Sequence, residues 1–217
     1  MLHYNTINDA LKSSLDILMT SPLFDSFRLV GGTALSLQKG HRISIDIDLF
    51  SDAPYGSIDF AAIDQFIETT FPFNNHHSDM SPSMGKSYII GENKEETIKL
   101  DVFYTDTFIQ DPFIEDNIRM ATLEEIAAMK IDIVQRGGRK KDFWDLLVLL
   151  SDIDIGTMLF LHEKRYPYSH NKNLILKNFT NFSLADNDFD PICLRGNYWE
   201  FVKEDIIEAV EKYKSTL

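Results

Sequence analysis

The feature that most constrains this fold is a pair of aspartates, Asp46 and Asp48, set two residues apart in an apolar stretch. Side chains two apart in a β-strand point to the same face, so both carboxylates would face one side of a sheet. The alternating apolar residues that would supply the opposite, buried face are Ile43, Ile45, Ile47 and Leu49. Like charges this close repel each other and favour protonation or a bound cation. The spacing therefore predicts a half-buried strand that presents two acidic ligands to a divalent ion.

Two glycines, Gly31 and Gly32, follow a short apolar run at 27–30 that predicts a buried strand, and Thr33 then opens a helical segment. A glycine turn lets the backbone approach a ligand, and the first amides of a helix attract anions. Mg²⁺ binds oxygen ligands and shares them with substrate phosphates, so the combination suits a nucleoside triphosphate. Taken singly, such a glycine turn is more often a tight connection. Likewise, a lone Asp-x-Asp pair is more often a solvated edge or a Ca²⁺ site.

The order of these residues resembles a known family. The matching residues are Gly31-Gly32-Thr33-Ala34-Leu35, then His41-Arg42, then Ser44-Ile45-Asp46-Ile47-Asp48-Leu49-Phe50. They are similar to the first motif of the nucleotidyltransferase-like toxins of the AbiEii/AbiGii family, within the DNA polymerase β-type nucleotidyltransferase superfamily. Thr33 stands where many members carry serine, and it keeps the hydroxyl. The resemblance covers residues 27–150 and implies a metal-dependent nucleotidyltransferase.

A third acid is predicted on a neighbouring strand. The stretch 74–104 has β character, with strands at 86–91 and 97–104 around the polar turn 92–96. Asp101 lies among the apolar residues of the second strand, so it needs a partner or a polar cleft. By the resemblance, it would bind the metal or take the proton of the attacking hydroxyl. A salt bridge to Lys99 or Arg119 is the alternative.

The chain becomes helical from Thr122, where a capping box with Glu125 predicts a helix that runs to residue 136. A second helix is predicted at 140–150. By the resemblance, Lys130 on the first helix would neutralise the triphosphate, and Asp142 on the second would be a carboxylate of the catalytic pocket. If the resemblance is set aside, Lys130 is interpreted as a lysine on the surface of its helix. Asp142 is then interpreted as an acid in the first turn of its helix, where the helix dipole favours a negative charge.

Several further residues are assigned by their position next to these motifs. Asp145 is expected to cap or orient its neighbours. Arg42 is expected to join Gly32, Thr33 and Lys130 in binding the triphosphate, whereas His41 is predicted to be a surface loop residue. Ser44 would lie near the mouth of the cleft, either as an acceptor for modification or as a polar strand residue.

The charge of the chain limits its partners. A net charge of −13 argues against binding nucleic acid over the whole surface, because phosphate contacts come from Lys and Arg. A local basic segment, RGGRKK at 136–141, could receive a polynucleotide, although a solvated turn between helices is the simpler interpretation. The single cysteine, Cys193, excludes an internal disulfide and is interpreted as a packing residue.

The predicted fold class is α+β. A small mixed sheet with flanking helices forms a nucleotidyltransferase core at 1–118, and a helical C-terminal lobe at 119–217 completes the cleft. Further helices are predicted at 5–20, capped by Thr6 or Asn5, and at 58–70, 158–166, 171–182 and 197–213.

No run is long and apolar enough to span a membrane, and no secretory signal is visible, which predicts a cytoplasmic protein without a membrane partner.

The predicted function is Mg²⁺-dependent transfer of a nucleotide from a nucleoside triphosphate to an acceptor hydroxyl. The resemblance implies a toxin of a type IV toxin–antitoxin or phage-defence pair, with a tRNA as candidate acceptor and a cognate antitoxin as candidate partner. Two alternatives stay open at this point. The same cleft could serve a kinase or a protein-modifying transferase, or the chain could be a catalytically silent nucleotide-binding module.

Overall fold

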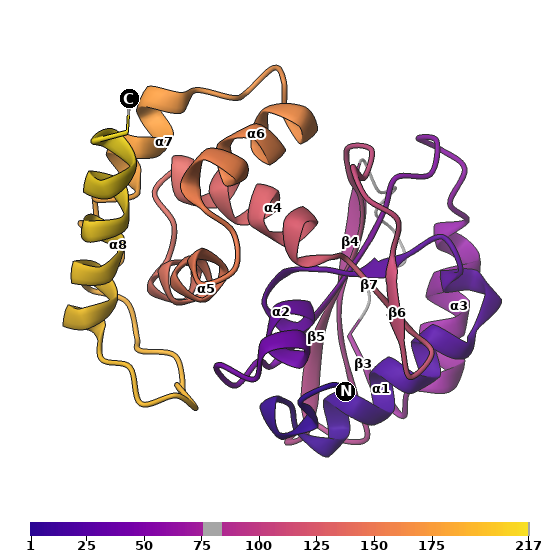
Figure 1. Ribbon diagram of the computed structural model, residues 1–217. Helices are drawn as coiled ribbons and strands as arrows, with labels where there is room; N and C mark the ends of the chain where they lie inside the picture. Colours follow the sequence, from indigo (N-terminus) through magenta and orange to yellow (C-terminus); the bar gives the residue numbers. More distant parts are fainter. Residues whose placement is uncertain (76–83, 217) are drawn as a thin grey trace.

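The computed structural model describes residues 1–75 and 84–216, and it shows an α+β protein with a mixed sheet beside a helical region (Figure 1). The predicted fold class is therefore confirmed. Most of the β structure that the sequence predicts between residues 74 and 85 lies outside the described residues.

One sheet contains seven strands among the described residues, in the order β3-β4-β5-β2-β1-β7-β6. Their bounds are β1 Arg28–Leu29, β2 Asp46–Ser51, β3 Phe73–Asn74, β4 Gly85–Gly91, β5 Thr97–Tyr104, β6 Phe113–Glu115 and β7 Ile118–Met120. β2 runs parallel to β5 and β1 parallel to β7, whereas the other neighbours are antiparallel. The register sets Asp48 directly opposite Asp101, and this pairing places the acidic site.

Three helices pack on the sheet: α1 Asp9–Thr20, α2 Gly31–Lys39 and α3 Phe60–Thr70. Figure 1 places α1 and α3 on one side of the sheet, and α2 on the side of the helical region. In β2, Ile47 and Leu49 are fully buried while Asp46 and Asp48 face the other way, as the alternation predicts. Burying each such aliphatic side chain contributes roughly 1.5–3 kcal/mol, which fixes the face on which the carboxylates lie.

Two predictions at the edges of these elements are wrong. Ile45 is 65% exposed, because β2 begins only at Asp46 and the preceding residues form a loop. The first helix begins at Asp9, not at residue 5. Asn8 is its N-cap and accepts a hydrogen bond of 2.8 Å from the Leu11 amide. Thr6 instead belongs to a 3₁₀ turn, Tyr4–Thr6, and its hydroxyl donates to the His3 carbonyl.

The hairpin of β6 and β7 is absent from the sequence predictions. Its two central residues, Asp116 and Asn117, have φ angles of 52° and 63°, a left-handed pair typical of two-residue hairpins. β7 pairs with β1, so the sheet continues to Met120. We therefore propose the division between core and helical region after Met120, because a boundary at 118 would cut this strand.

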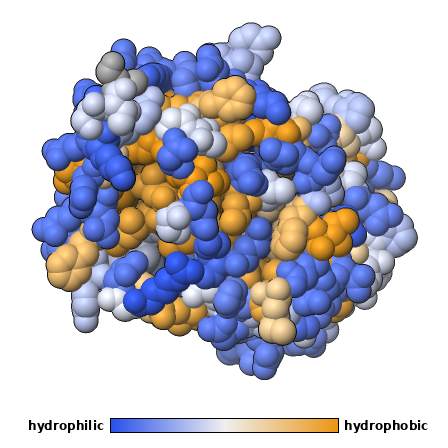
Figure 2. All heavy atoms as spheres, in the orientation of Figure 1, coloured by the Kyte–Doolittle hydropathy of each residue, from blue (hydrophilic) through white to orange (hydrophobic). Residues whose placement is uncertain are grey.

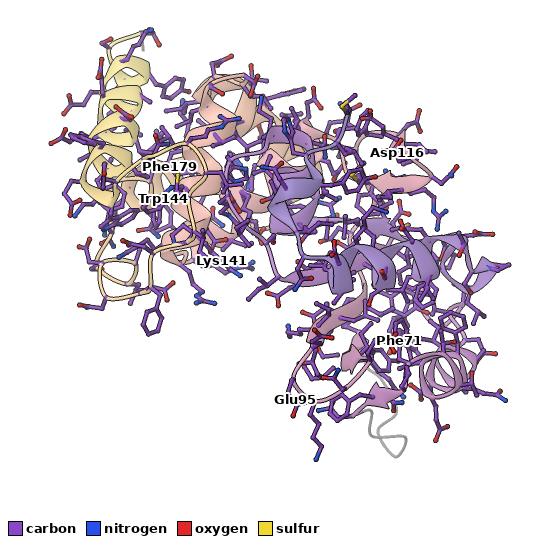
Figure 3. The ribbon with its side chains drawn as sticks, turned by 90° about the horizontal axis from the view of Figure 1, so that it is seen from below. Phe71, Glu95, Asp116, Lys141, Trp144 and Phe179 are labelled. Atoms are coloured by element: carbon purple, nitrogen blue, oxygen red, sulfur yellow. The ribbon has the colours of Figure 1, made fainter. Side chains whose placement is uncertain are left out.

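The helical region consists of α4 Leu123–Gln135, α5 Lys140–Leu150, α6 Ile155–Arg165, α7 Lys172–Asn178 and α8 Trp199–Lys214. Its core contains the stacked rings of Trp144 and Trp199, 5.6 Å apart, and Figure 3 shows Trp144 with Phe179 inside this region. The capping box at Thr122 is half formed. Thr122 accepts from the Glu125 amide, but the buried Glu125 carboxylate accepts from the Ile109 amide.

No helix in residues 1–75 and 84–216 is long and apolar enough to cross a membrane. Figure 2 shows hydrophilic side chains over most of the visible face, with apolar side chains gathered mainly over the helical region.

Candidate active site

Three carboxylates meet on one face of the sheet. Asp46 and Asp48 are alternate residues of β2, and Asp101 is the register partner of Asp48 on β5. Paired residues of neighbouring parallel strands point the same way, so the structure brings the three predicted acids together. Asp101 also accepts a 2.6 Å hydrogen bond from the Ser87 hydroxyl and pairs with Lys99. Of the two salt-bridge partners suggested for Asp101, Lys99 is therefore the one observed. Arg119 does not reach Asp101, because it donates to backbone carbonyls near α1.

The environment of Asp48 opposes its negative charge. Burial, followed by the charges of Asp101 and Asp46, raises the pKa of Asp48 from 3.8 to about 6. Lys130 and Lys141 act in the opposite direction and are too weak to restore the ordinary pKa. A divalent cation between the carboxylates would remove this repulsion, and carboxylate oxygens are the ligands that a hard cation prefers.

The paired glycines make room for side chains of the protein. Gly31 has a φ of +67°, and a Cβ atom there would lie 2.7 Å from the Asp48 carboxylate. A Cβ atom at Gly32 would lie 2.2 Å from the Arg42 guanidinium. Gly31 also begins α2, so the positive end of this helix lies beside Asp48.

Replacing Gly31 with alanine is expected to destabilise the fold by roughly 1–3 kcal/mol and to displace Asp48. Gly56 offers a matched control, because its φ is +85° and an added Cβ atom there would have no neighbour within 4 Å. Urea unfolding of Gly31→Ala and Gly56→Ala, with nucleotide binding measured by calorimetry, separates backbone strain from crowding. Equal losses in both variants would show that contact with Asp48 contributes nothing.

A buried ion cluster lies behind the carboxylates, and Asp145 is its centre. Asp145 accepts hydrogen bonds from Arg42 Nε at 2.7 Å, from Arg42 Nη2 at 2.9 Å and from His41 Nε2 at 2.8 Å. Lys130 Nζ lies 2.7 Å from Asp145 Oδ2, the oxygen that also accepts from Arg42 Nη2. Burial alone would raise the pKa of Asp145, but Lys130 and Arg42 hold it well below its ordinary value. Asp145 therefore orients its neighbours, as predicted, and does so as a charged group.

Lys130 and Asp142 form part of the same cluster. Lys130 Nζ donates to Asp142 Oδ1 at 2.8 Å, and Asp142 Oδ2 accepts from the Arg139 amide at 2.9 Å. Both side chains are almost fully buried, so Lys130 is not the helix-surface lysine of the alternative interpretation. Asp142 does lie in the first turn of α5, where its alternative interpretation also places it. Burial acts to lower the pKa of Lys130, yet Asp145 and Asp142 outweigh it and raise the pKa above its ordinary value.

Two other expected site residues, Thr33 and Ser44, and the neighbouring His41 are more enclosed than the sequence indicates. The Thr33 and Ser44 hydroxyls lie 2.8 Å apart, and Thr33 also donates to the Asp46 carbonyl, which ties α2 to β2. His41 is 1% exposed, so its prediction as a surface residue is wrong. Its ring is buried because Asp145, far along the chain, provides a partner for it.

Two further parts of the chain lie next to the carboxylates. Lys141 Nζ lies 3.9 Å from Asp46 Oδ2, and Figure 3 shows Lys141 on the side of the helical region nearest the sheet. Its signal in the sequence is the segment from Lys141 to Asp145, which resembles a later motif of the family that completes the pocket. The segment before α8 also reaches the site, since the Ile43 amide donates to the Ile192 carbonyl at 2.9 Å, and no sequence pattern predicts this contact.

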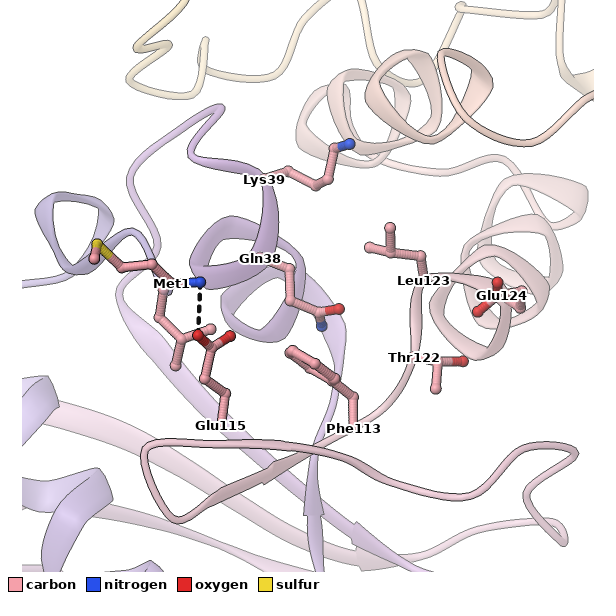
Figure 4. A pocket seen from close by; sticks show the side chains of 9 residues that line it. Met1, Gln38, Lys39, Phe113, Glu115, Thr122, Leu123 and Glu124 are labelled. Carbon is pink, nitrogen blue, oxygen red and sulfur yellow. Dashed lines mark ion pairs between the residues drawn. The ribbon is translucent and has the colours of Figure 1, made fainter.

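A pocket of about 280 Å³ opens beside Asp46, and its walls include Ser44, Arg42 and Lys141. Another pocket, of about 470 Å³, lies between α2 and the hairpin of β6 and β7, where the Met1 amino group pairs with Glu115 (Figure 4). That second pocket has none of the predicted site residues in its lining, so the pocket beside Asp46 is the better candidate for substrate.

The donor set fits a metal ion that shares its ligands with a substrate. Among the described residues, no group of three or more His, Cys, Asp or Glu side chains is arranged so that it could hold a metal ion by itself. Mg²⁺ characteristically takes one or two carboxylates and completes its shell with water and phosphate oxygens. The neighbouring carboxylates of Asp46 and Asp48 are of the chemical type that such an ion prefers.

The fold is one that solved nucleotidyltransferase structures share. The structure of a putative nucleotidyltransferase from Helicobacter pylori superposes with a TM-score of 0.61 at 19% identity, covering 97% of this chain and 96% of that one. MenT4, a nucleotidyltransferase toxin from Mycobacterium tuberculosis H37Rv, superposes with a TM-score of 0.58 at 17% identity, covering 90% and 78%. These likenesses establish the shared fold.

Sequence comparison identifies the family. Residues 14–215 match the family described as nucleotidyl transferase AbiEii toxin, type IV TA system, and the chain belongs to this family. An uncharacterized protein of Aquifex aeolicus (strain VF5) is 26% identical over 218 residues, which cover 93% of this chain and 95% of that protein. The predicted family and enzyme class are thus confirmed.

Proposed function

We propose that this protein transfers a nucleotide from a nucleoside triphosphate to an acceptor hydroxyl in a reaction that requires Mg²⁺. The observation that carries the proposal is the register of Asp48 against Asp101, with Asp46 on the same face of β2. Asp46, Asp48 and Asp101 would hold Mg²⁺, which when bound stabilises charge on the phosphoryl group and the leaving pyrophosphate.

The other residues act by position and charge. The N-terminus of α2 at Gly31 and Gly32 directs its amides toward the phosphates, and Lys141 supplies an ammonium group at the edge of the pocket. Lys130 and Arg42 are held by Asp142 and Asp145. We propose that these two buried cations contribute to triphosphate binding through their field and by fixing the wall of the pocket.

Within this proposal, the buried hydroxyls of Thr33 and Ser44 hold the aspartate strand against α2. Asp101 is suited to activate the acceptor, because it can share the metal or accept the proton of the attacking hydroxyl. The family description favours an antitoxin as protein partner. The acceptor we propose is RNA, with tRNA as the leading candidate, and the cell interior is where such a pair would act.

The test uses nucleoside triphosphates labelled at the α- or the γ-phosphate, incubated with total RNA, protein and Mg²⁺. Transfer of the α-label with release of pyrophosphate is expected, and Asp46→Asn should reduce it at least about a thousandfold. Asp25→Asn, which changes an exposed acid in the turn before β1, is the matched control. Transfer of the γ-label alone would make the protein a kinase and would contradict the proposal. Absence of any labelled RNA would contradict the proposed acceptor.

A further inference from the structure

Every cation of the basic segment 136–141 has an acidic partner in the structure. Arg136 pairs with Asp132, and Lys141 approaches Asp46. The remaining two pairs involve a single loop between α7 and α8. Arg139 binds Asp188 through two nitrogens at 3.1 Å, and Lys140 Nζ lies 2.8 Å from Asp190. Two of the four cations, Arg139 and Lys140, are therefore neutralised by residues about fifty positions further along the chain.

We call residues 186–192 the acidic loop. It is anchored at both ends, by the Trp199 indole, which donates to Asp186 at 2.8 Å, and by the Ile192 carbonyl, which accepts from the Ile43 amide. Between these anchors lies the sequence Asp188-Phe189-Asp190, in which the Phe189 side chain is 90% exposed. The Phe189 ring is therefore accessible to a partner that approaches the loop from solvent.

The acidic loop divides one groove into two pockets. The pocket beside Asp46 is lined by Asp188, Phe189 and Arg139. A second pocket, of about 600 Å³, is lined by Arg136, Arg139 and Asp188 and lies on the other side of the same ion pair. Arg139 and Asp188 belong to both linings, so their pairing forms the partition. Moving Asp188 away would join the two pockets into a basic channel that ends at the carboxylates.

We propose that the acidic loop occupies the path of the acceptor RNA backbone and must be displaced before RNA can reach Asp46. This inference deepens the proposed function and depends on it for the identity of the acceptor. The carboxylates of Asp188 and Asp190 take the places of two phosphates on Arg139 and Lys140. Phe189, exposed between them, lies where a base would lie, so the loop imitates a short stretch of single-stranded RNA.

One partner of each ion pair is open to solvent and the other is not. The side chains of Arg139 and Asp190 are 64% and 66% exposed, whereas those of Asp188 and Lys140 are 17% and 8% exposed. A phosphate offers Arg139 the same two-point contact that a carboxylate does, and a polynucleotide brings several phosphates at once. RNA can therefore compete with the loop through several contacts together, whereas a single small anion gains too little to displace it.

The experiment measures binding of a short fluorescein-labelled single-stranded RNA by anisotropy at low salt. Replacing both acids, in Asp188→Asn/Asp190→Asn, is expected to tighten binding about 3- to 10-fold, because the competing charges are removed while the cations remain. Asp190→Asn alone should give a smaller gain in the same direction. Arg139→Gln should weaken binding, and in that background Asp188→Asn should bring no gain.

A matched control removes the same charge elsewhere. Asp25→Asn/Glu68→Gln changes two exposed acids close to α3, at the far end of the molecule from α5 in Figure 1, and should leave RNA affinity within about 2-fold. Equal gains in this control and in the loop variant would overturn the inference, since net charge alone would then explain the effect. Unchanged or weaker binding by the folded loop variants, checked by circular dichroism, would overturn it as well.

The ligand class is tested with a fluorescent polyglutamate peptide, which carries acidic groups without bases. RNA is expected to bind the loop variant more tightly than this peptide, because bases can stack on aromatic side chains. If the loop variant binds both ligands with equal affinity, the occupant of the path covered by the acidic loop would be an acidic protein segment and not RNA. RNA binding is measured without Mg²⁺ or triphosphate. A negative result for this inference is therefore distinguishable from a failure of the proposed nucleotide transfer.

Discussion

Replacing Asp48 with asparagine is expected to abolish nucleotide transfer and, at the same time, to stabilise the metal-free protein at neutral pH. The loss of activity, at least about a thousandfold, follows from removal of a central ligand. The gain in stability follows from the raised pKa of about 6, against 3.8 for the free side chain. A difference of this size corresponds to roughly 3 kcal/mol as an upper value.

The sign of the pH dependence follows from the same shift. Because the pKa of Asp48 is higher in the folded chain, folding takes up a proton between about pH 4 and pH 6. The contribution of Asp48 to stability is therefore fully present below pH 4 and is lost as the pH rises through 6. The free energy of unfolding should be larger for Asp48→Asn than for the wild type at pH 7.5. At pH 4 the two values should be nearly equal.

Urea unfolding at these two pH values measures the difference directly, with Asp25→Asn as a control for the loss of one exposed charge. Addition of Mg²⁺ should stabilise the wild type at pH 7.5 and leave Asp48→Asn unaffected. A variant less stable than the wild type at pH 7.5 without metal would show that the three acids do not repel one another as described.

The second large effect is expected for Asp145→Asn, which removes the charge at the centre of the buried cluster. Arg42 and Lys130 would then stay buried with only Asp142 near them, and unpaired buried charges typically cost about 3–5 kcal/mol. Because the pKa of Asp145 is depressed, its contribution is present above about pH 4 and is lost as the pH falls toward the lower folded-state pKa.

Asp152→Asn provides the comparison, since Asp152 forms a partly exposed pair with Lys39 at 2.7 Å. That variant should lose no more than about 1 kcal/mol in the same urea titration at pH 7. If Asp145→Asn proves no more costly than Asp152→Asn, the buried cluster is not what holds α5 against the loop at His41 and Arg42.

Local patterns allowed much of the fold and the acidic face to be predicted. The alternation in β2 and β5 identified the carboxylate face, because strand periodicity depends on neighbouring residues alone. The helices predicted to end at residue 136 and to begin at 140 agree closely with α4, which ends at Gln135, and with α5, which begins at Lys140. The pairing of Asp48 with Asp101 required the family resemblance, since strand order is not a local property.

Long-range charge pairing escaped prediction. His41 and Arg42 look like loop residues until Asp145, more than a hundred positions later, is folded against them. The basic segment 136–141 likewise suggests an open nucleic-acid surface, and nothing near it in sequence indicates that Asp188 and Asp190 cover it. Which opposite charges meet is decided by the packing of α5, α8 and the acidic loop.

The central claim is that Asp46, Asp48 and Asp101 together bind the ion that nucleotide transfer requires. Crystals grown with Mn²⁺ and a non-hydrolysable nucleoside triphosphate would test it through the anomalous signal of manganese. The predicted result is a peak within about 2.5 Å of oxygens from Asp46 and Asp48 that also contacts the triphosphate. A bound triphosphate with manganese located away from these carboxylates would contradict the account.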